Sequence, residues 1–371
     1  MLAPMSVFEH RPALRWLVPL LAAVLLGAGT STVGIVTAAA RGGLPHRSAA
    51  QLLVDVQKAR LDGLSGTVVQ NAALGLPSVP GAEGSGSSNM SSLVSGSHTL
   101  RLWYADPDHV RIALQGTLGE SDLVRNGRDL WSWSSSDKSA THRVVPLSSN
   151  GTGHSLASAS PVTPQQAADE ALKAITPSTE VRTSGTATVA GRSAYELVLR
   201  PRERGSLVDS VRIAIDGKTR VPTRVQVFAK HVAKPALEVG FTSFDPSRPP
   251  RSMFRFNPPP HTKVTDSGSA APSKAHADQG RSAKQKDDAG SPPRVVGKGW
   301  TSVVVAHVPS GALTGSPTTA RMLAALPPVS GSWGSGRLLR GTLFSAVLTN
   351  DGRVAVGAVA PDALYTALAP S

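Results

Sequence analysis

The chain has 371 residues, enough for one large domain and a smaller one, and its 35 glycines and 29 prolines are typical of a protein with many turns. Its 38 lysines and arginines outnumber 25 aspartates and glutamates, but they are scattered rather than gathered into the patch that nucleic-acid binding requires. Because the chain has no cysteine, disulfide bonds, thiolate metal sites, cysteine nucleophiles and lipid-modified cysteines are excluded.

The first forty residues predict that the rest of the chain lies outside the cytoplasm. Arg11 and Arg15 precede an uncharged stretch at 16–40, which is long enough to span a membrane. The stretch ends in Ala38-Ala39-Ala40, which also suits a signal-peptidase site. With the basic flank kept inside, a retained anchor and a cleaved signal both place residues from 41 onward outside. Segment 1–40 is therefore predicted to be a signal or transmembrane segment, and the protein to be membrane-anchored or secreted.

An amphipathic helix is predicted to open the folded part. Ser48 and Gln51 have the spacing of a capping box, in which each side chain bonds a free backbone N–H of the first turn. Apolar residues then recur at helical spacing up to Leu61, and Gly63 is expected to end the helix.

After this helix the hydrophobic period changes to two, which predicts strands. The segments 99–104 and 109–115 flank an Asp106-Pro107-Asp108 turn and should form a hairpin. Alternate residues of a strand share one face, so the hairpin should carry one apolar face, with Arg101 and Arg111 on the opposite, wet face.

Further strands joined by tight turns indicate one large antiparallel sheet, curled or partly closed. Hairpin turns are predicted at Asn126-Gly127, Ala190-Gly191 and Asp216-Gly217. A second capped helix at 163–175 must bury its apolar stripe on a face of the sheet. The strands are predicted at 64–70, 122–125, 128–133, 186–189, 193–199, 208–215, 221–228 and 237–244.

Two segments of low complexity divide the chain. Residues 75–97 are predicted to be a long loop, and residues 265–294 a disordered linker, because neither contains enough large apolar residues to form a core. The tail at 295–371 is then a small α+β unit, or it packs on the first domain and completes it. Its predicted elements are a strand at 300–308, a helix at 316–326, a hairpin of 338–348 with 354–359, and a helix at 361–368.

Several short segments follow one another in a characteristic order along the chain. They are the capped helix before Leu64-Ser65-Gly66-Thr67, then Tyr104–Arg111, Asn126–Trp133, Val189–Leu197, Val211–Asp216 with Pro222, and Phe254–Pro259. This order, over residues 48–260, resembles the LolA/RseB superfamily of lipid carriers and envelope sensors. The resemblance implies an α+β fold with a large curved antiparallel β-sheet, an unclosed β-barrel with helices on its concave side, plus a small C-terminal α+β unit.

The resemblance also implies an apolar cavity for a lipid or an acylated protein. Plain core packing is the alternative for the same residues, since pockets and cores share residue types. The residues expected to line the cavity are Leu100, Leu102, Tyr104, Val110, Ile112, Leu114, Trp131 and Trp133.

The sequence contains no motif of a hydrolase, zinc protease, P-loop or dinucleotide-binding enzyme. We therefore expect no enzymatic activity, no metal, no cofactor and no nucleic-acid partner. A lipid or lipoprotein binding and transfer protein at the membrane surface is the first hypothesis. The alternative is an RseB-like sensor of envelope stress, whose C-terminal unit would contact a membrane-bound anti-sigma factor.

Overall fold

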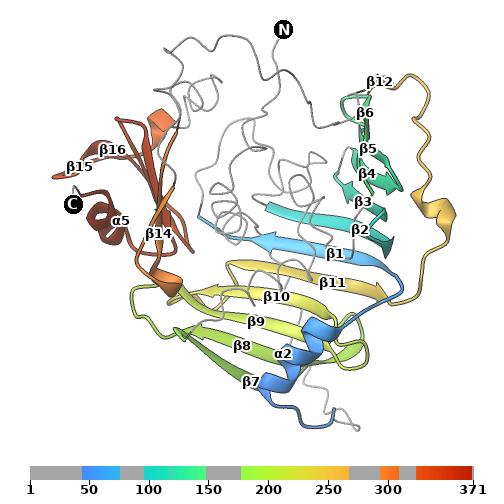
Figure 1. The fold of residues 1–371 in the computed structure, drawn as a ribbon, viewed down its shortest axis with the longest axis horizontal. Coiled ribbons are helices and arrows are strands. Elements are labelled where there is room, and N and C mark those ends of the chain that lie inside the picture. The colour runs from blue at the N-terminus through green and yellow to red at the C-terminus, as the bar shows by residue number, and fades with distance from the viewer. Residues whose placement is uncertain are drawn as a thin grey trace, which may run out of the picture.

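The computed structural model describes residues 44–75, 96–117, 119–147, 177–266, 293–308 and 323–369, which form two β-sheets and few helices (Figure 1). The predicted segment 16–40 and the predicted helix at 163–175 lie outside these residues, as do most of the loop at 75–97, the linker at 265–294 and the helix at 316–326. No helix in the described part of the chain is long and apolar enough to cross a membrane.

The large sheet has twelve strands in the order β12-β6-β5-β4-β3-β2-β1-β11-β10-β9-β8-β7. Neighbours pair antiparallel except β12 and β6, which run parallel. The two edge strands β12 and β7 are not neighbours, so the sheet is open, and it curves strongly (Figure 1). The predicted fold class, a large unclosed antiparallel sheet, is confirmed. Its strands are β1 (Leu64–Ala72), β2 (Gly96–Asp106), β3 (His109–Gln115), β4 (Glu120–Asn126), β5 (Asp129–Ser134), β6 (Ser139–Val144), β7 (Thr179–Val189), β8 (Arg192–Pro201), β9 (Val208–Asp216), β10 (Pro222–Ala229), β11 (Leu237–Asp245) and β12 (Lys263–Asp266).

Helix α2 (Ala49–Lys58) begins at the predicted capping box. The Ser48 hydroxyl accepts from the Gln51 backbone N–H at 3.2 Å, and the Gln51 side chain accepts from the Ser48 backbone N–H at 2.9 Å. The helix ends three residues before Leu61, earlier than its apolar spacing suggests, because Ala59 already has an extended conformation.

The turns show where local sequence decides the fold. Ala190 and Gly191 have φ of 49° and 72°, the left-handed pair that a two-residue hairpin loop needs, as predicted. The hairpin loop predicted at Asn126-Gly127 lies one residue further along the chain. Asn126 pairs with Asp129, so Gly127 and Arg128 form the loop, with Gly127 at φ 66°.

The C-terminal sheet has six strands in the order β13-β14-β18-β17-β16-β15. The segment 338–348, predicted as one strand, is instead two, because the chain turns at Gly341, whose N–H donates to the Phe344 carbonyl at 2.8 Å. The predicted helix at 361–368 is confirmed. The elements are β13 (Arg294–Val296), η6 (Gly299–Thr301), β14 (Val303–His307), β15 (Pro328–Gly331), β16 (Gly334–Arg340), β17 (Ser345–Thr349), β18 (Arg353–Gly357) and α5 (Pro361–Leu368).

A strap of residues 246–262 crosses from β11 to β12 along the outside of the sheet (Figure 1). It contains the short helix η4 (Arg251–Phe254), whose Phe254 is fully buried. Arg248 fixes its start by an ion pair with Asp106 at 2.9 Å. The residues Thr265 and Asp266, predicted to begin the linker, instead belong to β12, which the strap delivers to the edge of the sheet.

Candidate ligand-binding face

The register of β2 and β3 confirms the apolar face predicted for this hairpin. The pairs directly opposite each other are Leu100 with Leu114, Leu102 with Ile112, and Tyr104 with Val110. Because cross-strand partners point to the same side, all these side chains lie on one face of the sheet. We call it the inner face; the outer face is the opposite one, which carries Arg101 and Arg111.

The inner face continues across the whole middle of the sheet. Leu100 faces Val68 of β1, Val68 faces Phe241 of β11, and the rows continue through β10, β9 and β8. The sequence indicated these strands by their period of two, but not that they share a face with the predicted hairpin. The buried inner-face residues that they add are Val68, Leu197, Leu199, Val211, Ile213, Ile215, Val225, Leu237, Val239 and Phe241.

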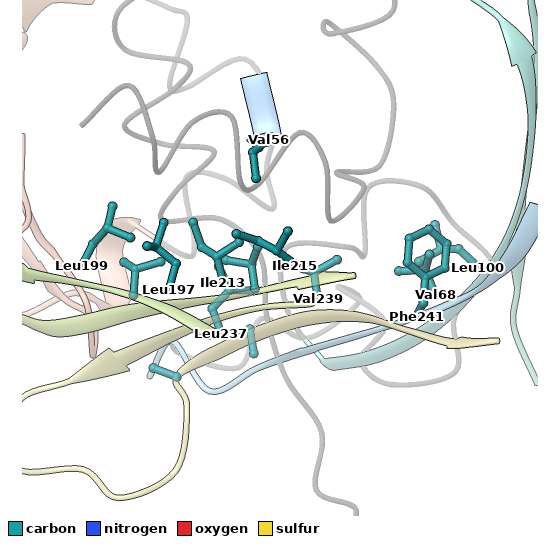
Figure 2. Close-up of a cluster of buried hydrophobic side chains, with 14 of the residues drawn as sticks. Val56, Val68, Leu100, Leu197, Leu199, Ile213, Ile215, Leu237, Val239 and Phe241 are labelled. Carbon is teal, nitrogen blue, oxygen red and sulfur yellow. The ribbon is translucent and has the colours of Figure 1, made fainter. Parts of the chain in front are cut away.

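Helix α2 packs on this face. Its Leu52 and Val56 are buried in the same cluster as the sheet residues. Figure 2 shows Leu197, Leu199, Ile213 and Ile215 projecting to the side on which Val56 lies. The sheet bends toward that side, so the apolar face is concave (Figure 2). The predicted position of the first helix, on the concave side, is confirmed.

Gly66 makes room for an aromatic ring on this face. A Cβ at Gly66 would lie 2.8 Å from Cδ1 of Phe241 and 2.3 Å from the Ser243 carbonyl oxygen. Real Cβ atoms do not approach so closely, so only glycine lets Phe241 lie over β1. This explains the glycine within Leu64-Ser65-Gly66-Thr67.

The margin of the inner face is partly exposed where β1, β2 and β11 meet. Leu64 pairs with Tyr104, and Phe244 pairs with Gly66 in the next row. All three large side chains pack against the apolar cluster without being fully buried. Burial raises the pKa of the Tyr104 hydroxyl, and the carboxylate of Asp106 raises it further.

The structure separates the two predicted tryptophans from the other six residues. Trp131 pairs with Val124, and Val124 pairs with Arg111, which places the ring on the outer face. Trp133 shares that face, and both rings pack against Phe256 of the strap, with centroids 5.4 and 6.3 Å apart. These tryptophans therefore do not line the concave face with Leu100 and its neighbours.

A partly buried polar pair lies on the same face as this aromatic group. Arg111 donates to Asp122 at 2.5 Å, and Asp122 is only 2% exposed. Burial raises the pKa of the Asp122 carboxyl, although the neighbouring guanidinium opposes that shift. Trp103 is stacked between Arg101 and Arg111, whose guanidinium carbons lie 5.0 and 5.5 Å from its ring centre. This part of the outer face is a packed polar and aromatic layer.

The C-terminal sheet is attached to the inner-face cluster. Trp300 packs against the cluster and donates from its indole Nε1 to the Thr179 hydroxyl at 2.8 Å. Main-chain bonds join the sheets as well, from Leu207 N to the Ala358 carbonyl at 2.8 Å and from Thr342 N to the Leu74 carbonyl at 2.7 Å. The tail therefore has a sheet of its own and also contacts the first domain.

Comparisons with known proteins found similar structures but no similar sequence family. No protein-family model and no curated protein matches the sequence. The MucA/MucB complex of Pseudomonas aeruginosa is matched at 16% identity over 86% of this chain and 97% of that chain, with a TM-score of 0.42. An uncharacterised conserved protein from Thermus thermophilus is matched at 13% identity over 59% and 98% of the two chains, with a TM-score of 0.33.

A LolA-superfamily protein from Nitrosomonas europaea is matched at 11% identity over 57% of this chain and 99% of that chain, with a TM-score of 0.22. This chain is similar to structures of the MucB and LolA type. The likeness concerns general architecture.

Proposed function

We propose that this protein binds a lipid or the acyl chain of a lipoprotein against the inner face of its large sheet, outside the cytoplasm. The observation that carries the proposal is the extent of the apolar face. It runs from β8 to β3, with the buried polar residues Gln70 and His98 set within it, and α2 is the one α-helix of the described residues that packs on it. Most residues of this face are buried, so it is at the partly exposed margin that an acyl chain would remove further apolar surface from water.

The partly exposed margin formed by Leu64, Tyr104 and Phe244 is the proposed entrance. Its residues are apolar along their length, while the Tyr104 hydroxyl offers a polar group at the edge. This combination suits a ligand with an apolar chain and a polar end. We propose binding and transfer rather than catalysis.

Lipid bound to protein purified from its native host should be detected by extraction and mass spectrometry. Saturable uptake of a fluorescent fatty acid by the full chain should follow. Ile112→Trp, which fills space on the inner face, should weaken this uptake by at least tenfold. A parent protein that carries no lipid and takes up no probe would refute the proposal.

Arg101→Trp is the matched control, because it adds the same side chain to an exposed position of the outer face. It should leave uptake unchanged. Overpacking costs about 1–3 kcal/mol, so circular dichroism and thermal melting must first show that the Ile112→Trp protein is folded. If a folded Ile112→Trp protein takes up the probe as the parent does, the inner-face residues are ordinary core.

An RseB-like sensor is the second candidate, and the attachment of the C-terminal sheet favours it. Trp300, Leu343 and Ala358 pack against the inner-face cluster, so a ligand that moved this cluster would also move the second sheet. A membrane-bound regulatory protein would then be the partner. Its capture should require residues 295–371 and should change when lipid is added. If capture of the partner does not depend on lipid, the sensor hypothesis fails and lipid binding and transfer remains the proposed function.

The location outside the cytoplasm can be tested separately. A reporter enzyme that works only outside the cytoplasm, fused after Ser371, should be active. The physical ground is the basic flank before the uncharged stretch 16–40. Activity of a cytoplasmic reporter alone would overturn the proposed location.

A further inference from the structure

The outer face of β7, β8 and β9 has a hollow of about 360 Å³ that is rich in arginine. This volume falls within the range of small-molecule sites, about 300–1,000 Å³. The hollow is on the opposite side of the sheet from the apolar face, so it is a separate feature. The residues lining it are Glu180, Arg182, Thr183, Ser184, Val198, Arg200 and Arg212.

The sheet register sets the positions of the guanidinium groups. Arg182 pairs with Val198, and Val198 pairs with Arg212, so two arginines flank one buried valine in a single cross-strand row. Arg200 follows Val198 by two residues on the same face of β8. Three guanidinium groups therefore surround an apolar floor.

Two of these arginines are held in place by neighbouring side chains. The guanidinium of Arg212 lies 4.6 Å from the ring centre of Phe228, and its Nη1 is 3.9 Å from Oε1 of Glu196. Glu196 is engaged further, because it accepts from the Ser184 hydroxyl at 2.5 Å and lies 3.7 Å from Arg224. Glu180 holds Arg182 by an ion pair.

The remaining charges do not cancel. Arg200 is directly opposite Glu180 on the neighbouring strand, yet Glu180 forms its ion pair with Arg182. Among the described residues, Arg200 has no ion-pair or hydrogen-bond partner, and the Nε of Arg212 is buried without one. A face built only for stability would pair opposite charges that are directly across from each other. In this hollow, the charge of Arg200 and the Nε donor of Arg212 have no partner among the described residues.

We propose that this hollow binds a phosphate group. A guanidinium presents donors in a planar fork that matches two phosphate oxygens, and the free fork of Arg200, beside the charges of Arg182 and Arg212, matches a tetrahedral anion with several oxygens. A carboxylate would leave part of this donor set unused. The phosphate can belong to a phospholipid headgroup or be a free ion, and both offer the same chemistry to the arginines.

The attachment of the N-terminal chain to the sheet is relevant to whether the phosphate belongs to a phospholipid headgroup. Leu44 contacts the turn at Gly217, and the Tyr195 hydroxyl donates to the Pro45 carbonyl at 2.9 Å. The chain that follows the stretch 16–40 is thus fixed to β8 and the β9–β10 turn, and β8 and β9 also form the hollow. If 16–40 is a retained anchor, as in the proposed location, it leads directly to these strands, which is the reason to test a headgroup as the source.

The test is calorimetric titration of the full chain, at low salt, with two probes: inorganic phosphate and glycerol phosphate. Saturable binding of either probe supports the site, and tighter binding of glycerol phosphate identifies a lipid headgroup as the source. Tighter or equal binding of inorganic phosphate identifies the free ion. Absence of saturable binding of both probes overturns the proposal, and this outcome is independent of fatty-acid uptake by the inner face.

Variants localise the binding. Arg200→Gln should weaken it by roughly tenfold or more, the loss expected for one charge-assisted hydrogen bond. Because Arg200 is exposed and unpartnered among the described residues, this change leaves the fold intact. Arg212→Lys, which keeps the charge but removes the fork, should weaken binding as well. Arg143→Gln, at an exposed position on β6, is the control and should bind as the parent does. Equal losses in Arg143→Gln and Arg200→Gln would show non-specific attraction and overturn the proposal.

Discussion

Arg125 donates a hydrogen bond to the carboxylate of Asp108 at 2.6 Å, and the pair joins the turn between β2 and β3 to strand β4. The arginine is only 2% exposed although it carries a charge. It also donates to the carbonyls of Gly127 at 3.2 Å and Pro146 at 2.8 Å. One guanidinium therefore fixes two hairpin turns and the chain that follows β6.

We expect Arg125→Met to lower the free energy of unfolding by about 3 kcal/mol, because removing one partner of a buried ion pair leaves the other groups without donors. Urea denaturation at neutral pH measures this. Arg128→Met changes an exposed residue of the adjacent turn and should shift stability by less than about 0.5 kcal/mol. Similar losses in both variants would show that Arg125 contributes no more than a surface residue.

Asp216 organises the turn between β9 and β10. It accepts two hydrogen bonds from Arg192, at 2.6 and 2.9 Å, and others from the backbone N–H groups of Lys218 and Thr219. Its carboxyl is desolvated by burial, but these donors prevail and lower its pKa to about 2. A group whose pKa is lower in the folded state stabilises the fold above its ordinary pKa and loses that effect as pH falls.

Acid should therefore weaken the fold through Asp216. The shift from the ordinary value of 3.8 to about 2 corresponds to about 2 kcal/mol, present above pH 4 and lost toward pH 2. Asp216→Asn should lower stability at pH 7 and flatten the pH dependence between 5 and 2, as measured by urea denaturation across that range. Asp362→Asn, at an exposed position of α5, should keep the parent's pH dependence. If Asp216→Asn keeps the parent's pH dependence of stability, Asp216 is not the group responsible for it.

The elements that could be predicted from the sequence are those with a clear local signal. The strand at His109–Gln115 alternates apolar and polar residues, and the helix at 361–368 begins with a proline and a first-turn Asp362. Strand β6 could not be predicted, because Ser139–Val144 has no apolar alternation and forms through its pairing with β5. All four residues of β12 are exposed, so its place depends on β6 and the strap.

The face on which a side chain lies could be predicted within one hairpin, but not where it depends on the register between hairpins. Leu100 and Ile112 share a face because they belong to one short hairpin. The face of Trp131 depends on the pairing of Gln115 with Glu120, across the connection between β3 and β4. A shift of one residue there would move both tryptophans to the inner face. No pattern within β5 itself carries that information.

His142 clamps β12 to the edge of the sheet and should make this contact pH-dependent. Its Nε2 lies 2.9 Å from Asp129 and its Nδ1 lies 3.0 Å from Asp266, while the ring stacks on Trp131 at 4.4 Å. The hydrogen bond with Asp129, and then that with Asp266, raise the pKa of His142 above its ordinary 6.5. Both nitrogens can donate only in the protonated ring.

A raised histidine pKa means that the stabilisation is full below pH 6.5 and is lost as pH rises through the folded-state pKa. We expect the amide of Lys263, which donates to the Lys138 carbonyl at 2.8 Å, to lose protection from hydrogen exchange as pH rises above 6.5, after correction for intrinsic rates. In His142→Gln the protection should be weak and independent of pH. A parent that shows no change across this range would refute the clamp.

At the junction between the two sheets, Trp300 combines apolar packing with the hydrogen bond to Thr179. Trp300→Ala removes both, while the main-chain bonds of Leu207 and Thr342 remain possible. Because the indole is only partly buried, the loss should be roughly 2 kcal/mol, below that of a fully buried tryptophan.

This loss should be felt locally, since the two sheets each keep their own core cluster. The amides of Leu207 and Thr342 bond across the junction, so their hydrogen exchange should accelerate about 30-fold, the factor that corresponds to about 2 kcal/mol. Amides inside the C-terminal sheet should keep their protection. Trp103→Ala, which removes the same side chain from the outer face of β2, should leave both junction amides as they are in the parent. Faster exchange throughout the C-terminal sheet would mean that it does not fold without the junction, and unchanged exchange at Leu207 would mean that Trp300 does not hold the two sheets together.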